Sequence, residues 1–162
     1  MKKRMIVFGG NIFTSMNYNN GDYEIKKNKV LNKLNEKFDL LNFSNENLTS
    51  KKALQYAQIF LKANQFDECI LELGSADSKL SSVAEFENNL DKIVTLLFNN
   101  NIKPVFVSMP NGNKNEEYQN VIDSIVKKYD LSLISFDKND EASYACVSTE
   151  AQFKKAIMNL CL

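Results

Sequence analysis

The sequence predicts a three-layer α/β/α domain with a central five-stranded parallel sheet, and three observations carry this prediction. The chain has 162 residues, a length typical of one domain. Five short apolar runs have the length of buried strands. Stripes of apolar residues at helical spacing lie between these runs, so strand and helix alternate, and parallel pairing through right-handed crossovers follows from that order. We therefore expect residues 1–162 to form a single domain without a linker or an internal repeat.

The expected strands are nearly continuous in apolar residues, as in parallel strands that helices cover on both faces. They comprise residues 4–8, 39–43, 69–73, 104–108 and 131–135. Pro104 opens the fourth run, where a proline costs little because the first residue of a strand can dispense with its N–H.

The expected helices follow from apolar stripes with amphipathic spacing. The first stripe is formed by Tyr23, Val30, Leu31, Leu34 and Phe38. The others lie within residues 54–61, 83–97, 118–129 and 153–160. Three helix starts carry a short polar residue three positions before Glu or Gln, an arrangement that satisfies free amides at a helix N-terminus. These pairs are Ser82 with Glu85, Asn113 with Glu116, and Thr149 with Gln152.

Composition narrows the functional classes. Twenty basic and twenty acidic residues cancel, which argues against nucleic acid or an anionic membrane as a partner. The apolar stretch at residues 5–8 is too short for a signal peptide, and no stretch is long enough to span a bilayer.

The three cysteines, Cys69, Cys146 and Cys161, are widely spaced and form no metal-binding pair or disulfide framework. We expect a cytoplasmic protein with no metal and no cofactor; the sequence makes no prediction of its oligomeric state.

Ligands of such sheets bind beyond the carboxyl ends of the strands. The segments at these ends are residues 9–18, 44–49, 74–81, 109–113 and 137–147. The chain contains no histidine, the side chain that most often transfers protons near neutral pH. Any chemistry at this edge must therefore do without an imidazole.

Three strand-end sequences resemble those of a known family. Gly9-Gly10-Asn11 follows the first strand, Gly74-Ser75-Ala76-Asp77 follows the third, and the fourth ends in Val107-Ser108-Met109-Pro110. Together with the order and spacing of the elements over almost the whole chain, they resemble the SGNH (GDSL-type) esterase and acylhydrolase family. The resemblance implies the SGNH-hydrolase, flavodoxin-like architecture.

The same resemblance implies that the catalytic positions are substituted. Asn11 stands where the family has its nucleophilic serine, and an amide cannot form an ester intermediate. Ala76 replaces the asparagine that donates to the oxyanion, a loss that typically costs about a hundredfold or more in rate. The second block, around Ser44, lacks the family's oxyanion-hole glycine, although backbone amides can still donate.

The family's last block, Asp-x-x-His, can be matched in two registers. One places Ser143 at the acid and Cys146 at the base, and the other places Asp140 at the acid and Ser143 at the base. Cys146 is interpreted as a small residue filling space rather than as a nucleophile, because no histidine can activate it.

The candidates for ligand contact are the strand-end residues Gly9, Asn11, Ser44, Gly74, Asp77, Asn111 and Cys146. Gly9 and Gly74 also suit turns that need positive φ or close backbone approach. Asp77 is expected to tie its loop rather than to bind a ligand.

Three functional hypotheses follow. The favoured one is a catalytically degenerate SGNH-like protein that binds a small acylated or glycosylated molecule or a partner protein. The second is an active ester or acyl hydrolase that uses a displaced Ser or Cys. The third is a flavodoxin-like small-molecule binder with residues 9–15 as a phosphate loop, although these lack the dense Ser, Thr and Gly pattern of such loops.

Overall fold

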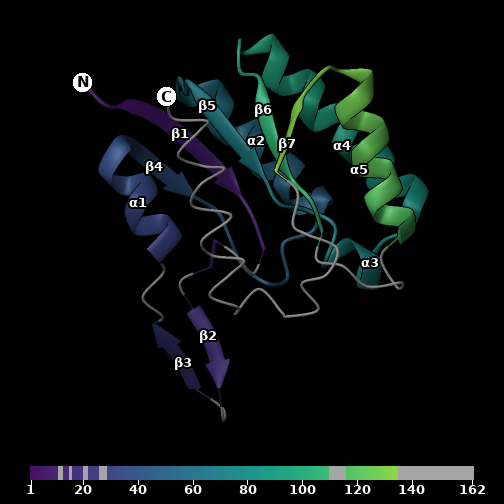
Figure 1. Cartoon of the computed structure of the whole chain (residues 1–162), viewed down its shortest axis with the longest axis horizontal. Coiled ribbons are helices and arrows are strands. Elements are labelled where there is room, and N and C mark those ends of the chain that lie inside the picture. Colours follow the sequence, from purple (N-terminus) through teal and green to yellow (C-terminus); the bar gives the residue numbers. More distant parts are fainter. Residues whose placement is uncertain (11–12, 15, 20–21, 26–28, 110–115, 135–162) are drawn as a thin grey trace.

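A computed structural model describes residues 1–10, 13–14, 16–19, 22–25, 29–109 and 116–134 (Figure 1). Several predictions lie outside the described residues: the helix at 153–160, the last block with Asp140, Ser143 and Cys146, the candidates Asn11 and Asn111, and the caps at Asn113 and Thr149.

The central sheet has five parallel strands in the order β4-β1-β5-β6-β7. They are β1 (Lys3–Phe8), β4 (Phe38–Asn42), β5 (Glu68–Leu71), β6 (Pro104–Val107) and β7 (Ser132–Ile134). Each overlaps one expected run, so the predicted sheet is confirmed. The order places the second strand of the sheet beside the first and the third on its other side, which is the flavodoxin-like arrangement. Its switch point, where ligands bind in such folds, lies between the carboxyl ends of β1 and β5.

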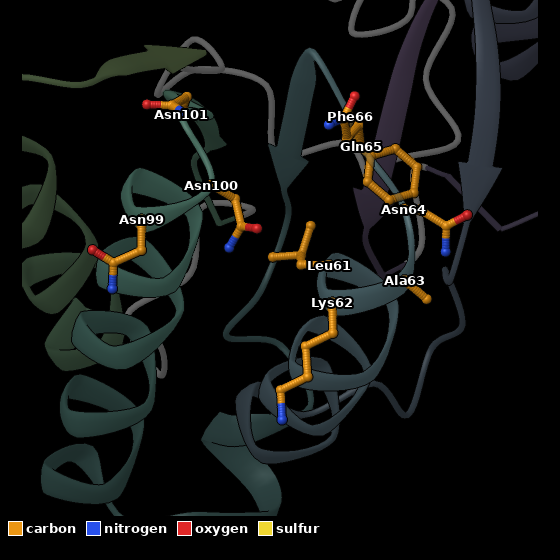
Figure 2. A pocket seen from close by; sticks show the side chains of 9 residues that line it. All are labelled: Leu61, Lys62, Ala63, Asn64, Gln65, Phe66, Asn99, Asn100 and Asn101. Atoms are coloured by element: carbon orange, nitrogen blue, oxygen red, sulfur yellow. The ribbon is translucent and has the colours of Figure 1, made fainter.

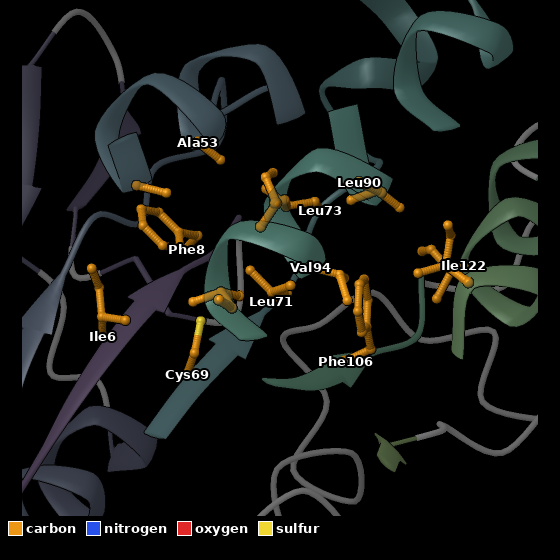
Figure 3. Close-up of a cluster of buried hydrophobic side chains, with 14 of the residues drawn as sticks. Ile6, Phe8, Ala53, Cys69, Leu71, Leu73, Leu90, Val94, Phe106 and Ile122 are labelled. Carbon is orange, nitrogen blue, oxygen red and sulfur yellow. The ribbon is translucent and has the colours of Figure 1, made fainter. Parts of the chain in front are cut away.

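Helices cover both faces of the sheet (Figure 1). The helices α2 (Ser50–Ala63), α4 (Val83–Asn99) and α5 (Glu116–Lys128) pack on one face, and α1 (Lys29–Lys37) packs on the other. Alternate strand residues point to opposite faces. Ile6 and Phe8 join the cluster under α2, α4 and α5 (Figure 3), whereas Met5 and Val7 join the cluster under α1. The three-layer prediction is therefore confirmed.

The stretch before α1 corrects one prediction. Instead of a helix beginning near Tyr23, an antiparallel hairpin is formed by β2 (Met16–Asn19) and β3 (Asp22–Ile25), with Tyr18 paired to Tyr23. The residues that connect the two strands are Asn20 and Gly21, the pair most favoured in two-residue hairpin turns. The helical stripe was therefore wrong at Tyr23, and also at Phe38, which begins β4.

The helix starts agree with the expected capping chemistry where the structure describes them. The hydroxyl of Ser82 accepts a hydrogen bond of 3.2 Å from the Glu85 amide at the start of α4, as predicted. Thr49 caps α2 in the same way, accepting from the Lys52 amide at 3.4 Å. A further short helix, α3 (Asp77–Leu80), lies in a segment that we expected to be a loop. Within the described ranges, no helix combines the length and the apolar character needed to cross a membrane.

Candidate functional site

The turns after β1 and β5 meet at the switch point through a buried carboxylate, that of Glu72. Its backbone amide donates to the Phe8 carbonyl at 2.9 Å, which extends the pairing of β5 with β1 by one residue. Its Oε2 accepts from the Gly10 amide at 2.9 Å. Glu72 therefore holds the turn that follows β1.

Gly9 permits a close approach of side chains to the first turn. A Cβ at this position would lie 2.8 Å from the Ser44 hydroxyl oxygen and 3.1 Å from Glu72 Oε2. The first of these distances is shorter than real side chains tolerate, so the space above Gly9 is already occupied. This agrees with the close backbone approach that we expected for Gly9.

The second turn, which follows β4, is held against the first turn, which follows β1, by polar contacts around Asn42. The Ser44 hydroxyl donates to Asn42 Oδ1 at 2.5 Å, and the Asn42 amide group donates to the Phe13 carbonyl at 3.0 Å. The backbone amide of Asn45 donates to the Gly9 carbonyl at 3.1 Å. The proton of the Ser44 hydroxyl is thus directed at a neutral amide oxygen and not at a base.

The third turn, which follows β5, is built around Gly74. It is apolar where it meets Met109 in the fourth turn, which follows β6. Gly74 has φ of +119°, and a Cβ there would lie 2.6 Å from the Met109 sulfur, so both its backbone conformation and its neighbour require glycine. Ala76 is buried and precedes α3 without a side-chain hydrogen bond. The side chain at this point of the turn is therefore a buried methyl group, which can donate no hydrogen bond.

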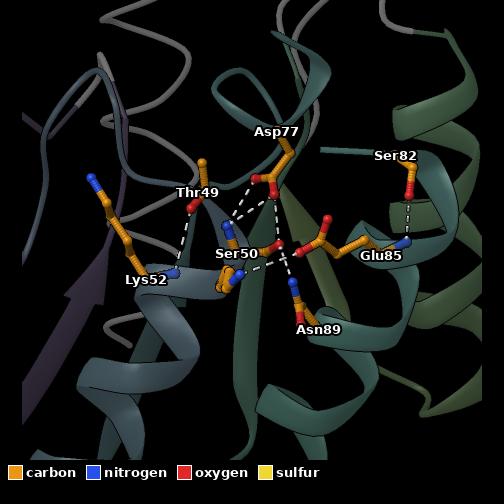
Figure 4. Close-up of polar contacts among 8 residues, drawn as sticks. Thr49, Ser50, Lys52, Asp77, Ser82, Glu85 and Asn89 are labelled. Atoms are coloured by element: carbon orange, nitrogen blue, oxygen red, sulfur yellow. Dashed lines mark hydrogen bonds and ion pairs between the residues drawn. The ribbon is translucent and has the colours of Figure 1, made fainter. Parts of the chain in front are cut away.

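Asp77 lies at the centre of a buried polar network (Figure 4). Its two carboxylate oxygens accept from the Ser50 backbone amide at 3.0 and 2.9 Å, and Oδ1 accepts from the Ser50 hydroxyl at 2.6 Å. The side-chain amide of Asn89 donates to the Ser50 hydroxyl oxygen at 3.1 Å. Because Ser50 is the first residue of α2, the carboxylate satisfies a free helix amide at the positive end of the helix dipole.

Burial raises the pKa of Asp77 above its ordinary value, while the hydrogen bonds from Ser50 oppose that rise. The network joins the third turn to α2 and α4. This is the loop-tying role that the sequence analysis favoured for Asp77.

Sequence reasoning did not single out Glu72, Asn42, Ser50 or Asn89, although the structure places all four in these contacts. Glu72 had a signal, since a lone charge between Leu71 and Leu73 in an apolar run suggests a buried, partnered carboxylate. Burial raises the pKa of the Cys69 thiol, which leaves it an inert core group. No three His, Cys, Asp or Glu side chains gather as metal ligands in the part of the chain that the structure describes.

The sequence matches no model of a protein family and no curated protein, whereas its fold resembles solved structures. A lipase/acylhydrolase from Enterococcus faecalis has a TM-score of 0.74 at 14% identity, with 98% of this chain and 95% of that chain covered. The SGNH-hydrolase family esterase AlinE4 has a TM-score of 0.68 at 20% identity, with coverage of 99% and 95%. The esterase EstA from Pseudoalteromonas sp., solved with monoethylphosphonate as inhibitor, has a TM-score of 0.70 at 15% identity, with coverage of 98% and 96%.

The chain has the SGNH-hydrolase fold. Identities of this size establish the fold and leave the chemistry to be argued from the residues. Of the positions matched to SGNH motifs, the structure brings Gly9 and Ser44 together beside Glu72, and sets Gly74 against Met109. Asp77 is bound by Ser50 instead of facing the first turn.

Proposed function

We propose that this chain is a catalytically degenerate protein on the SGNH scaffold, which binds a small acylated or glycosylated molecule at the carboxyl edge of the sheet without hydrolysing it. The observation that carries the proposal is the absence of histidine from all 162 residues. A serine hydroxyl is a weak nucleophile until a base takes its proton, and SGNH-type chemistry assigns that task to an imidazole.

The serine hydroxyl groups near this edge support the proposal. None of the three whose acceptors the structure gives both donates to a base and can be reached by a substrate. Ser44 donates to the amide oxygen of Asn42, and Ser78 donates to the Ser75 carbonyl at 3.0 Å. Ser50 does donate to a carboxylate, that of Asp77, but both residues are completely buried, so a substrate cannot reach the pair.

The third turn also favours binding over turnover. Catalysis requires contacts that strengthen as the oxyanion forms, and a side-chain donor at the position of Ala76 would supply one. The buried methyl of Ala76 offers no such contact. The apolar contact of Gly74 with Met109, together with the polar side chains of Ser44 and Glu72 around Gly9, suits a ligand with one apolar arm and one polar group.

One NMR experiment tests binding and turnover together, with methyl butyrate as the acyl-ester probe. We expect saturable shifts of the backbone amides of Gly9, Gly10 and Gly74, and no methanol release above that of a heat-denatured sample. Unshifted glycine amides at saturating probe would contradict binding at this edge. Methanol release abolished by a single Ser or Cys substitution would instead establish the displaced hydrolase.

A gain-of-function series tests the degenerate positions directly. Asn11→Ser alone should leave p-nitrophenyl ester hydrolysis at background, because the base and the oxyanion donor are still missing. The triple variant Asn11→Ser/Ala76→Asn/Cys146→His is the matched restoration test. Robust hydrolysis by the single variant would refute the proposal.

A further inference from the structure

A pocket of about 460 Å³ lies between the ends of two helices (Figure 2). It is lined by residues 61–66 and 99–101, at the ends of α2 and α4. The chain enters β5 and β6 shortly after these segments. The pocket therefore lies at the amino edge of the sheet, opposite the carboxyl edge that holds the candidate site. The volume falls in the usual range for small-molecule sites, roughly 300–1,000 Å³.

The two helices that frame the pocket end differently. In α4 the backbone returns on itself: the Ile102 amide donates to the Leu97 carbonyl and the Asn101 amide donates to the Phe98 carbonyl, both at 2.9 Å, with Asn101 at φ of 60°. This is a Schellman ending, which satisfies the last carbonyls of a helix. In α2 the cap residue Asn64 is extended, with φ of −141° and ψ of 149°. The chain therefore leaves α2 without such a return.

The end of α2 consequently presents hydrogen-bond acceptors. The Asn64 side-chain amide donates to the Phe60 carbonyl at 3.2 Å. Among the residues that the structure describes, none donates a hydrogen bond to the carbonyls of Leu61, Lys62 or Ala63. Unsatisfied carbonyls at a helix C-terminus also carry the negative end of the helix dipole.

Carboxamide side chains add further acceptors. Five of the nine lining residues carry one, namely Asn64, Gln65, Asn99, Asn100 and Asn101. The Asn100 amide group donates to the Leu96 carbonyl at 2.8 Å, as that of Asn64 does to Phe60, so the oxygens of both side chains are left to accept. Between these polar groups, Leu61 and Phe66 are buried apolar residues of the lining.

We propose that this pocket binds a small neutral molecule rich in hydroxyl groups, of the monosaccharide or polyol class. Acceptors and two helix C-termini disfavour an anion, and the ammonium group of Lys62, which also lines the pocket, disfavours a cation. Hydroxyl donors complement the carbonyl and carboxamide oxygens, while the C–H face of such a molecule suits Leu61 and Phe66. The site is separate from the one proposed for function, and does not depend on it.

The probe is D-glucose, titrated into the labelled protein and followed by backbone amide shifts. We expect saturable shifts confined to residues 61–66 and 99–101. The control compound is glucose with all of its hydroxyl groups methylated, which keeps the ring but has no hydrogen-bond donors. It should leave these amides unshifted. Absence of saturable shifts with glucose, or equal shifts with the methylated compound, would overturn the proposal.

A matched pair of variants locates the site. Ala63 lines the pocket and Ala84 does not, yet both are exposed helical alanines. Ala63→Leu should weaken glucose binding by at least about tenfold, equivalent to 1.4 kcal/mol, whereas Ala84→Leu should leave it unchanged. Asn99→Ala, which breaks no hydrogen bond within the described residues, should weaken binding severalfold even if Ala63→Leu perturbs folding. Unchanged affinity in both pocket variants would place glucose elsewhere and refute the site.

Discussion

Removing the carboxylate of Asp77 should destabilise the protein strongly, because three hydrogen bonds from one buried residue converge on it. In Asp77→Ala, the backbone amide and the hydroxyl of Ser50 both lose their acceptor, in a place where neither Ser50 nor residue 77 is exposed to water. A buried donor left unsatisfied costs about 1–3 kcal/mol. Since the hydroxyl can rotate toward another partner while the amide cannot, we expect a loss of about 2–4 kcal/mol in the free energy of unfolding.

Urea unfolding followed by circular dichroism measures that loss. The matched control is Asp123→Ala, which removes an exposed carboxylate. Within the described residues this carboxylate accepts a hydrogen bond only from the side-chain amide of Gln119, at 2.8 Å, so its loss should change the free energy of unfolding by less than about 0.5 kcal/mol. A double-mutant cycle with Ser50→Ala should give a coupling energy of about 0.5–3 kcal/mol, because the two side chains are in contact. If Asp77→Ala lay within about 0.5 kcal/mol of the wild type, the network would not hold the third turn and the reasoning would fail.

Three further predictions concern the same edge and the core. Burial raises the pKa of Asp77 in the folded state, so the stability of the wild type relative to Asp77→Asn should be greatest below the unfolded pKa and should fall as pH rises through the folded pKa. The measurement is the difference between the urea midpoints of the two proteins across acidic pH, and a difference that grows in favour of the wild type as pH rises would contradict this. Gly74→Ala should lower the free energy of unfolding by about 1–3 kcal/mol more than Gly10→Ala, because of these two only Gly74 combines a positive φ with a Cβ position that clashes with Met109. Equal urea midpoints for the two variants would refute this. With Cys146 and Cys161 replaced by serine, Cys69 should react with a thiol reagent only after unfolding, and rapid labelling of the native protein would show that it is not buried.

The sheet could be predicted from the sequence because burial on both faces leaves a run of apolar residues that needs no knowledge of partners. The strand boundaries were less accurate for the same reason. Phe43 extends the second run but lies beyond β4, where its ring stacks on Phe8 with centroids 5.7 Å apart and on Tyr56 at 5.1 Å. Apolar residues that pack over the end of a strand look, in sequence, like part of it.

The hairpin and the site contacts needed information that the apolar pattern does not contain. Tyr23 fits the stripe of α1 by spacing alone, and only the local chemistry of Asn20-Gly21 indicates a turn there. The carboxyl-edge rule selects loops and not contacts, and the partners of Asp77 are distant in sequence, with Ser50 lying 27 positions away. Such contacts are fixed by how α2 and α4 pack, which no short motif encodes.

The contacts at the carboxyl edge show that the residues resembling the hydrolase signature are needed by the fold itself. Gly9 is required by the approach of Ser44, Gly74 by its φ of +119°, and Asp77 by the start of α2, so each supports the fold whether or not the protein is a catalyst. Their presence is therefore no evidence for turnover. The informative positions are those whose side chains would take part in the chemistry: an amide donor at position 76 would serve an oxyanion, and an imidazole would serve a nucleophile. The chain has no histidine and carries alanine at position 76, and the proposed binding function accounts for both observations.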